Sequence, residues 1–165
     1  MTNMADVSTV GPDLEKFRHY LMTLARCQMT PVLRVRFDPE DVVQQTLLEA
    51  LQGYARHRGR TEAELAGWLR TILSRNLIDL GRTLDVQKRN IALERSMDAT
   101  LTMVSLRLRD VLADGGTSVS GKIIRHETMM RLAGALARLP ERQRAAVEMH
   151  HLQGFSFKET ADMLE

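Results

Sequence analysis

Basic side chains gather in one short segment of the sequence and on the polar face of the helix predicted after it. The segment from Gly53 to Thr61 lacks apolar periodicity and holds four basic residues around Gly59, which predicts a flexible loop. Arginine forks suit phosphates and guanine edges, so a nucleic-acid surface is one interpretation. A solvated charged face without a ligand is the other. The candidate DNA-binding residues are Arg56, His57, Arg58, Arg60, Arg70, Ser74 and Arg75.

Motifs for enzymatic chemistry do not occur in the sequence, which contains no Gly-rich phosphate loop, no HExxH and no nucleophile elbow. Cys27 is the one cysteine, so an internal disulfide and a cysteine-based zinc site are excluded. His150 and His151 are adjacent, and neighbouring side chains on a helix point in different directions, which suits a metal poorly. We therefore expect no catalytic residue, no metal site and no cofactor.

The composition favours a globular protein of the cytoplasm. Hydrophobic residues make up 44% of the chain, enough for a core, and a single cysteine suits a reducing compartment. No run approaches the roughly 18 apolar residues of a membrane span. The formal net charge is only +2, so any nucleic-acid surface must depend on where the arginines lie.

Helices must position these candidate residues, because apolar residues recur three and four positions apart and strand signals are scarce. The sequence thus predicts an all-α fold. A first helix should end near Pro31, and a later one should span residues 62–84 with Arg70, Ser74 and Arg75 on its polar face. Its buried stripe would consist of Leu65, Leu69, Ile72, Leu73, Leu77 and Leu80. Asn76 projects into that stripe and should be hydrogen-bonded locally, since an unsatisfied buried amide is costly.

The helix between these two has a strong start signal, with Asp38 as N-cap and Pro39 in the first turn. It should run to about residue 52 or 54. Helical geometry gives an inward face of Val43, Leu47, Ala50, Leu51 and Tyr54. The opposite face carries Asp41, Gln44, Gln45, Leu48 and Gln52. Leu48 suits a partner helix, although an isolated surface leucine is also ordinary.

Start and stop signals follow one another near the C-terminus. Pro140 suits a first helical turn and Gly154 a helix end. Ser156 and Glu159 then form a capping box. The sequence predicts a helix, a turn and the first helix of a helix-turn-helix, whose core would include Leu152, Phe155 and Ala161.

Turn and linker residues interrupt the chain around 114–121, where Gly and Ser are frequent. We expect two small helical domains, over residues 12–95 and 126–165, joined by a flexible linker over 96–125. Within that linker, the apolar spacing also allows a short helix.

Two parts of the sequence resemble bacterial RNA polymerase sigma factors of the extracytoplasmic-function group. The first comprises FDPEDVVQQTLLEA at 37–50 and WLRTILSRNLID at 68–79, and looks like region two of that family. The second comprises LPERQR at 139–144 and GFS at 154–156, and looks like region four. Their order and separation make the resemblance more specific than either part alone.

The resemblance implies a promoter-specificity subunit that binds core RNA polymerase and promoter DNA. Asp41, Gln44, Gln45 and Leu48 would dock on the coiled coil of the largest polymerase subunit. The basic loop, with Arg70, Ser74 and Arg75, would hold the opened −10 element. Region four would read the −35 element, with Ser156, Glu159 and Ala161 as helix-turn-helix scaffold, and an anti-sigma protein is a further partner to consider.

The sequence also departs from the family. The segment from Gly81 to Asp85 is less basic than in many members, so its share of DNA affinity is smaller. The −35 reading helix is expected after residue 165, which leads us to expect a C-terminally truncated chain. Two other functions stay open: a helix-turn-helix repressor, which should self-associate on symmetric half-sites, and a helical protein-interaction module.

Overall fold

The computed structural model describes residues 13–57, 61–84, 99–100, 102–107 and 119–165, the last from residue 126 on with side chains. All regular structure in these residues is helical, so the all-α prediction is confirmed. The elements are η1 (Glu15–Phe17), α1 (Arg18–Gln28), α2 (Pro31–Arg36), α3 (Pro39–Gly53), η2 (Tyr54–Arg56), α4 (Glu62–Leu84), α6 (Val119–Ala137), α7 (Glu141–Val147), the π-helix η3 (Glu148–Gln153) and α8 (Phe157–Leu164). Residues 102–107 form a further short helix.

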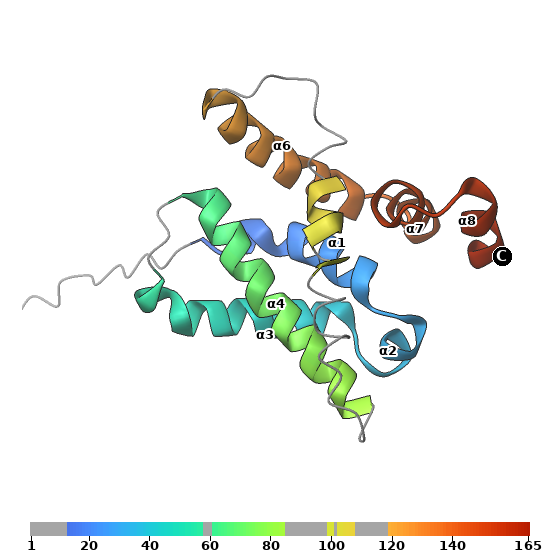
Figure 1. The fold of residues 1–165 in the computed structure, drawn as a ribbon, viewed down its shortest axis with the longest axis horizontal. Coiled ribbons are helices and arrows are strands. Elements are labelled where there is room, and N and C mark those ends of the chain that lie inside the picture. Colours follow the sequence, from blue (N-terminus) through green and yellow to red (C-terminus); the bar gives the residue numbers. More distant parts are fainter. Residues whose placement is uncertain (1–12, 58–60, 85–98, 101, 108–118) are drawn as a thin grey trace, which may run out of the picture.

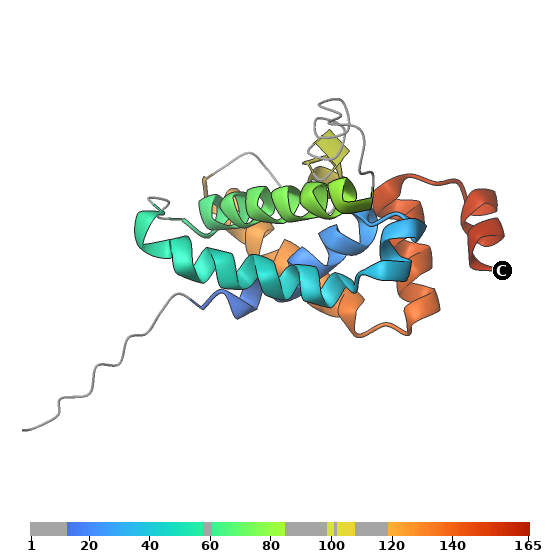
Figure 2. The same cartoon turned by 90° about the horizontal axis from the view of Figure 1, so that it is seen from below.

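Helix α1 lies at the centre of the molecule and contacts α3, α4, α6 and η3 (Figures 1 and 2). Phe17, Leu21 and Leu24 are fully buried, because their spacing of three and four places them on one face of this first helical stretch. As expected, α1 ends shortly before Pro31, which occupies the first turn of α2 behind the N-cap Thr30. The central position of α1 lets it join α3, α4, α6 and η3 to one another.

Helix α3 begins as the sequence predicts. The Asp38 carboxylate accepts a hydrogen bond from the Glu40 amide (2.8 Å), and Pro39 lies in the first turn. Val43, Leu47 and Ala50 are buried as expected, whereas the expectation that Leu51 and Tyr54 face inward is wrong, because both are exposed. Val42 and Thr46 are buried instead. Since α1 and α4 both pack on α3, the buried stripe is turned toward these two residues.

Helix α4 has the predicted bounds, and five of its six predicted stripe residues are buried, with Leu80 half-buried. Asn76 is hydrogen-bonded as expected, but its partner is Thr46 of α3 (3.1 Å) rather than a local group. Ser74 is only 5% exposed, so its expected place on the polar face is wrong. The small side chain of Ser74 lies at the edge of the buried stripe, because it follows Leu73 by one residue and is rotated from it by about 100° around the helix.

Helix α6 packs on α1, and its buried residues Met129, Ala133 and Leu136 belong to the same hydrophobic cluster as those of α1, α3 and α4. The predicted linker, residues 96–125, contains the helical residues 102–107, where Val104 is also buried in this cluster. The short helix allowed there by the apolar spacing is therefore present. The division into two domains stays a prediction.

The C-terminal helices follow the predicted signals with two differences. Gly154 has φ +86° and ends η3, and Ser156 and Glu159 form the predicted capping box at α8. Pro140 is the N-cap of α7 rather than a first-turn residue. Ala161 is exposed, so its expected core role is wrong; Thr160, one position earlier and 100° around α8, is the buried residue.

Candidate functional site

The four residues predicted to dock polymerase all lie exposed on α3. Gln44 accepts a hydrogen bond from Arg18 of α1 (2.7 Å), and Gln45 donates one to Glu49 (2.8 Å). Leu48 is the apolar member of this surface, and exposed Leu51 lies one turn from it. The structure thus brings Asp41, Gln44, Gln45 and Leu48 together on one face, as the sequence predicts.

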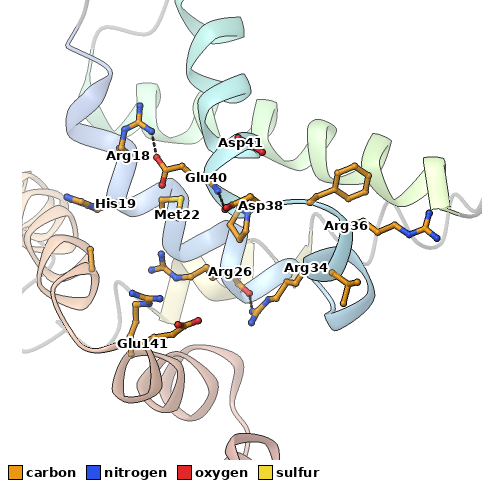
Figure 3. A pocket seen from close by; sticks show the side chains of 15 residues that line it. Arg18, His19, Met22, Arg26, Arg34, Arg36, Asp38, Glu40, Asp41 and Glu141 are labelled. Carbon is orange, nitrogen blue, oxygen red and sulfur yellow. Dashed lines mark hydrogen bonds and ion pairs between the residues drawn. The ribbon is translucent and has the colours of Figure 1, made fainter.

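Two hollows border this face. The smaller, of about 380 Å³, lies between α3 and α4 and is lined by Phe37, Asp41, Val42, Gln45, Asn76, Asp79 and Leu80. The larger, of about 850 Å³, is a groove between α1, α2 and the start of α3 on one side and the end of α6 and the start of α7 on the other (Figure 3). Phe37 and Asp41 line both hollows, so the two form a continuous surface around the start of α3.

The larger groove has both basic and acidic side chains. Arg26, Arg34 and Arg36 come from α1 and α2, and acidic side chains come from the first turn of α3 (Figure 3). Arg18, a further basic side chain of α1, donates hydrogen bonds to two carboxylates, those of Glu40 (2.7 Å) and Glu15 (2.7 Å). The Arg18 hydrogen bond holds the pKa of the Glu15 carboxyl below its usual range. A groove with both signs of charge suits a polypeptide better than a simple anion.

The residues predicted to bind DNA differ in how far they are exposed to solvent. Arg56 and Arg75 are exposed, whereas Arg70 is half-buried and its guanidinium points to Ser105 Oγ (3.4 Å). Ser74 is buried, which removes it from any DNA-contacting surface. Arg58 and Arg60 lie outside the described residues.

His57 has a structural environment that the sequence did not reveal. Its ring stacks on Trp68 of α4, with centroids 4.3 Å apart and an interplanar angle of 12°. Its Nε2 is buried and has no hydrogen-bond partner among the described residues. Gly53 lies against the far edge of the same indole, where a Cβ would be 3.2 Å from the ring. This stack anchors the start of the basic loop to α4.

Sequence reasoning missed a buried ion pair between Arg26 of α1 and Glu148 of η3. The guanidinium binds the carboxylate through Nη2 (2.6 Å) and Nε (2.9 Å), and the side chains are only 11% and 5% exposed. Beside it, burial raises the pKa of the Cys27 thiol to about 12. No signal in the sequence pairs two charged residues 122 positions apart.

The helix-turn-helix segment is held by a capping box, a ring contact and a hydrogen bond from Arg107. In the capping box, the Ser156 hydroxyl accepts from the Glu159 amide (3.2 Å), and Glu159 accepts from the Ser156 amide (2.8 Å). The bonds from Ser156 lower the pKa of the Glu159 carboxyl. His150 packs its ring on Phe157 of α8 (centroids 3.8 Å apart), and Arg107 donates to the Leu152 carbonyl (3.1 Å).

The described residues contain no group of three or more His, Cys, Asp or Glu side chains that could hold a metal ion. Within the same part of the chain, no helix is long and apolar enough to cross a membrane.

Comparison with protein families gives one match. Residues 129–165 match the model of the family described as sigma-70, region 4, which covers part of α6 and all of α7, η3 and α8. That family is a non-enzymatic DNA-binding domain of transcription factors. The searches of curated proteins and of solved structures found no match to the chain.

Proposed function

We propose that the chain is a promoter-specificity factor of the extracytoplasmic-function group, which binds core RNA polymerase and promoter DNA in the cytoplasm. The match of residues 129–165 to sigma-70 region 4 carries this proposal. The match falls on a segment with helix-turn-helix signals, the left-handed Gly154 and the Ser156 capping box. It also favours this function over a repressor or a general interaction module.

In this proposal, the exposed face of α3 docks on the polymerase. Its acidic and amide side chains, with Leu48 among them, combine polar groups with one apolar anchor. Interfaces of this kind owe most of their affinity to a few anchors and their specificity to charge complementarity. The α3 face is available for this, because α1 and α4 cover the opposite side of the helix.

DNA binding would come from Arg56, Arg58, Arg60, Arg70 and Arg75, without the buried Ser74. Energy from holding an opened, flipped base and its backbone would offset the few kcal/mol that unstacking costs per step. The stacked ring of His57 would support the loop rather than contact a base.

Capture of core RNA polymerase by the immobilised chain tests the proposal. The parent chain should retain polymerase, and Asp41→Arg combined with Gln45→Ala should abolish retention, because the change places a positive charge on the docking face. Glu127→Arg, which reverses an exposed charge on α6, is the matched control and should bind as the parent does. Failure of the parent chain to retain polymerase would refute the proposed function. Full retention by the double variant would show that the docking face is elsewhere.

A further inference from the structure

A hydrogen bond between two side chains joins helix α4 to helix α3 inside the molecule. The Asn76 amide nitrogen Nδ2 donates to Thr46 Oγ1 (3.1 Å), and the Thr46 hydroxyl donates in turn to the carbonyl of Val42 (2.8 Å). Thr46 is fully buried, and Asn76 is half-buried in the wall of the hollow between the two helices. The two bonds therefore form a continuous polar link from α4 to the backbone of α3.

The surroundings of this link are apolar. Val43 and Leu47 of α3 and Leu73 and Leu77 of α4 are buried in one hydrophobic cluster, and the two helices pack against each other (Figure 2). Apolar contacts have no preferred direction, so such side chains can repack after a small slide or rotation of a helix. A hydrogen bond needs a particular distance and angle. The polar link thus admits fewer relative positions of α3 and α4 than the apolar contacts alone.

Buried polar side chains between helices are known to fix how the helices align. A single buried asparagine in a coiled coil sets the register of the two helices and lowers their stability. Two apolar side chains of similar volume would stabilise an interface at least as well, because they leave no polar group to be desolvated. Stability alone therefore does not explain a buried Asn76–Thr46 pair, whereas a fixed register does.

The bond also lies beside both surfaces of the proposed function. Thr46 directly follows Gln45 of the docking face, and Asn76 directly follows Arg75 of the proposed DNA surface. Gln45 and Arg75 are both exposed. A shift of one helix by a single residue moves its side chains by about 1.5 Å along the axis and about 100° around it. A change of register between α3 and α4 would thus change the direction of Arg75 relative to a docked polymerase.

We propose that Asn76 and Thr46 are positioning residues, whose hydrogen bond sets the register of the DNA-contacting helix α4 against the polymerase-docking helix α3. Neither side chain contacts polymerase or DNA. Their bond holds Arg75 where the opened strand lies once α3 has docked. The proposal rests on the proposed function and adds to it two residues that belong to neither surface.

Selection of DNA by the complex of polymerase and chain tests this role, with the affinity for polymerase measured beside it. The complex is offered duplexes with an opened segment of random sequence, and enrichment of the motif that the parent chain selects is measured by sequencing. Thr46→Val removes a fully buried hydroxyl and keeps the shape of the side chain. It should lower the enrichment about tenfold, which corresponds to the free energy of about one hydrogen bond. Its affinity for polymerase should equal that of the parent, because the docking face is unchanged.

Two further variants are controls. Thr46→Ser keeps the hydroxyl and should restore most of the enrichment. Thr23→Val removes an equally buried hydroxyl, which likewise donates to the carbonyl four residues earlier, that of His19 (3.1 Å). The Thr23 hydroxyl accepts from Arg26 (3.3 Å), so both of these bonds lie within α1. This variant should select DNA as the parent does.

Thr46→Val combined with Asn76→Leu separates register from stability. Both partners become apolar, so the thermal unfolding midpoint should equal or exceed that of the parent. The enrichment should stay as low as that of Thr46→Val. Parental enrichment by this folded double variant would overturn the proposal. So would a loss of polymerase affinity as large as the loss of enrichment, which would make Asn76 a direct contact. Absence of enrichment by the parent chain would refute the proposed function, and the positioning role with it.

Discussion

Arg26 and Glu148 form an ion pair that is almost completely buried. Both charges are nearly removed from water, so each depends on the other to offset its desolvation. Arg26 also donates to Thr23 (3.3 Å), which helps to fix the guanidinium. The pair joins the central helix α1 to the segment that matches sigma-70 region 4.

Glu148→Ala should lower the free energy of unfolding by about 3–5 kcal/mol, because it leaves a buried guanidinium unpaired. Urea unfolding followed by circular dichroism measures this loss. Glu127→Ala, at an exposed position of α6, should change stability by less than about 0.5 kcal/mol. Replacement of both partners, Arg26→Met with Glu148→Leu, should restore much of the stability. If the single and double variants were equally unstable, the account of the pair would be wrong.

His126 gives α6 a dependence on pH. Its side chain is about nine-tenths buried, and its Nε2 has no hydrogen-bond partner among the described residues. Burial lowers the pKa of this imidazole below its usual 6.5, against the opposing effect of Glu62 (Nε2 to Oε2 3.6 Å), while Lys16 lowers it further. The neutral ring therefore fits the folded protein, and the protonated ring fits it less well.

The stability that this ring contributes should be complete above pH 6.5 and should fall as pH drops through the lowered pKa of the folded state. Chemical unfolding at a series of pH values between 8 and 5 measures the effect. His126→Phe keeps an apolar ring and should lose less stability over that interval than the parent. A parent and variant with the same pH dependence would contradict this assignment.

At the scale of elements, capping signals predict where helices begin and end better than periodicity predicts which way they face. Asp38, Gly154 and Ser156 act through local geometry, so the sequence locates them correctly. The predictions that Leu51 and Ala161 are buried and that Ser74 is exposed were wrong, because burial depends on which helices pack nearby. The exposed α3 face could be predicted, because its polar residues favour solvent. The exposure of Leu51 could not, because an apolar residue at the edge of a stripe can lie on either side.

Two glycines allow a matched test of backbone conformation. Gly154→Ala should destabilise the protein by more than about 1 kcal/mol, since φ is +86° and a Cβ would collide with the Arg107 guanidinium. Gly67 lies in the second turn of α4 with open space around it, so Gly67→Ala should stabilise the protein by up to about 1 kcal/mol through helix propensity. Thermal unfolding of both variants measures the difference. Equal effects of the two substitutions would show that the turn does not need a glycine.

At the scale of the whole molecule, one hydrophobic cluster contains residues from both predicted domains. Val43 of α3, Leu69 of α4, Ala133 of α6 and Leu152 of η3 all belong to it. This arrangement could not be predicted from the sequence, because no sequence signal indicates that α1 contacts η3, where Arg26 pairs with Glu148. Even so, the cluster leaves the outer face of α3 and the exposed Arg56 and Arg75 accessible. The residues proposed to bind polymerase on α3, and the proposed DNA contacts Arg56 and Arg75, therefore all face solvent in the arrangement observed.

Selection of DNA by core polymerase, with and without the chain, tests the central claim most directly. Immobilised polymerase would be given duplexes with an opened segment of random sequence, and the retained DNA would be sequenced. We predict that the chain enriches a recurrent motif in the opened strand that polymerase alone does not enrich, and that Arg56→Ala with Arg75→Ala weakens the enrichment. The same retained sequences with and without the chain would contradict its role as a promoter-specificity factor.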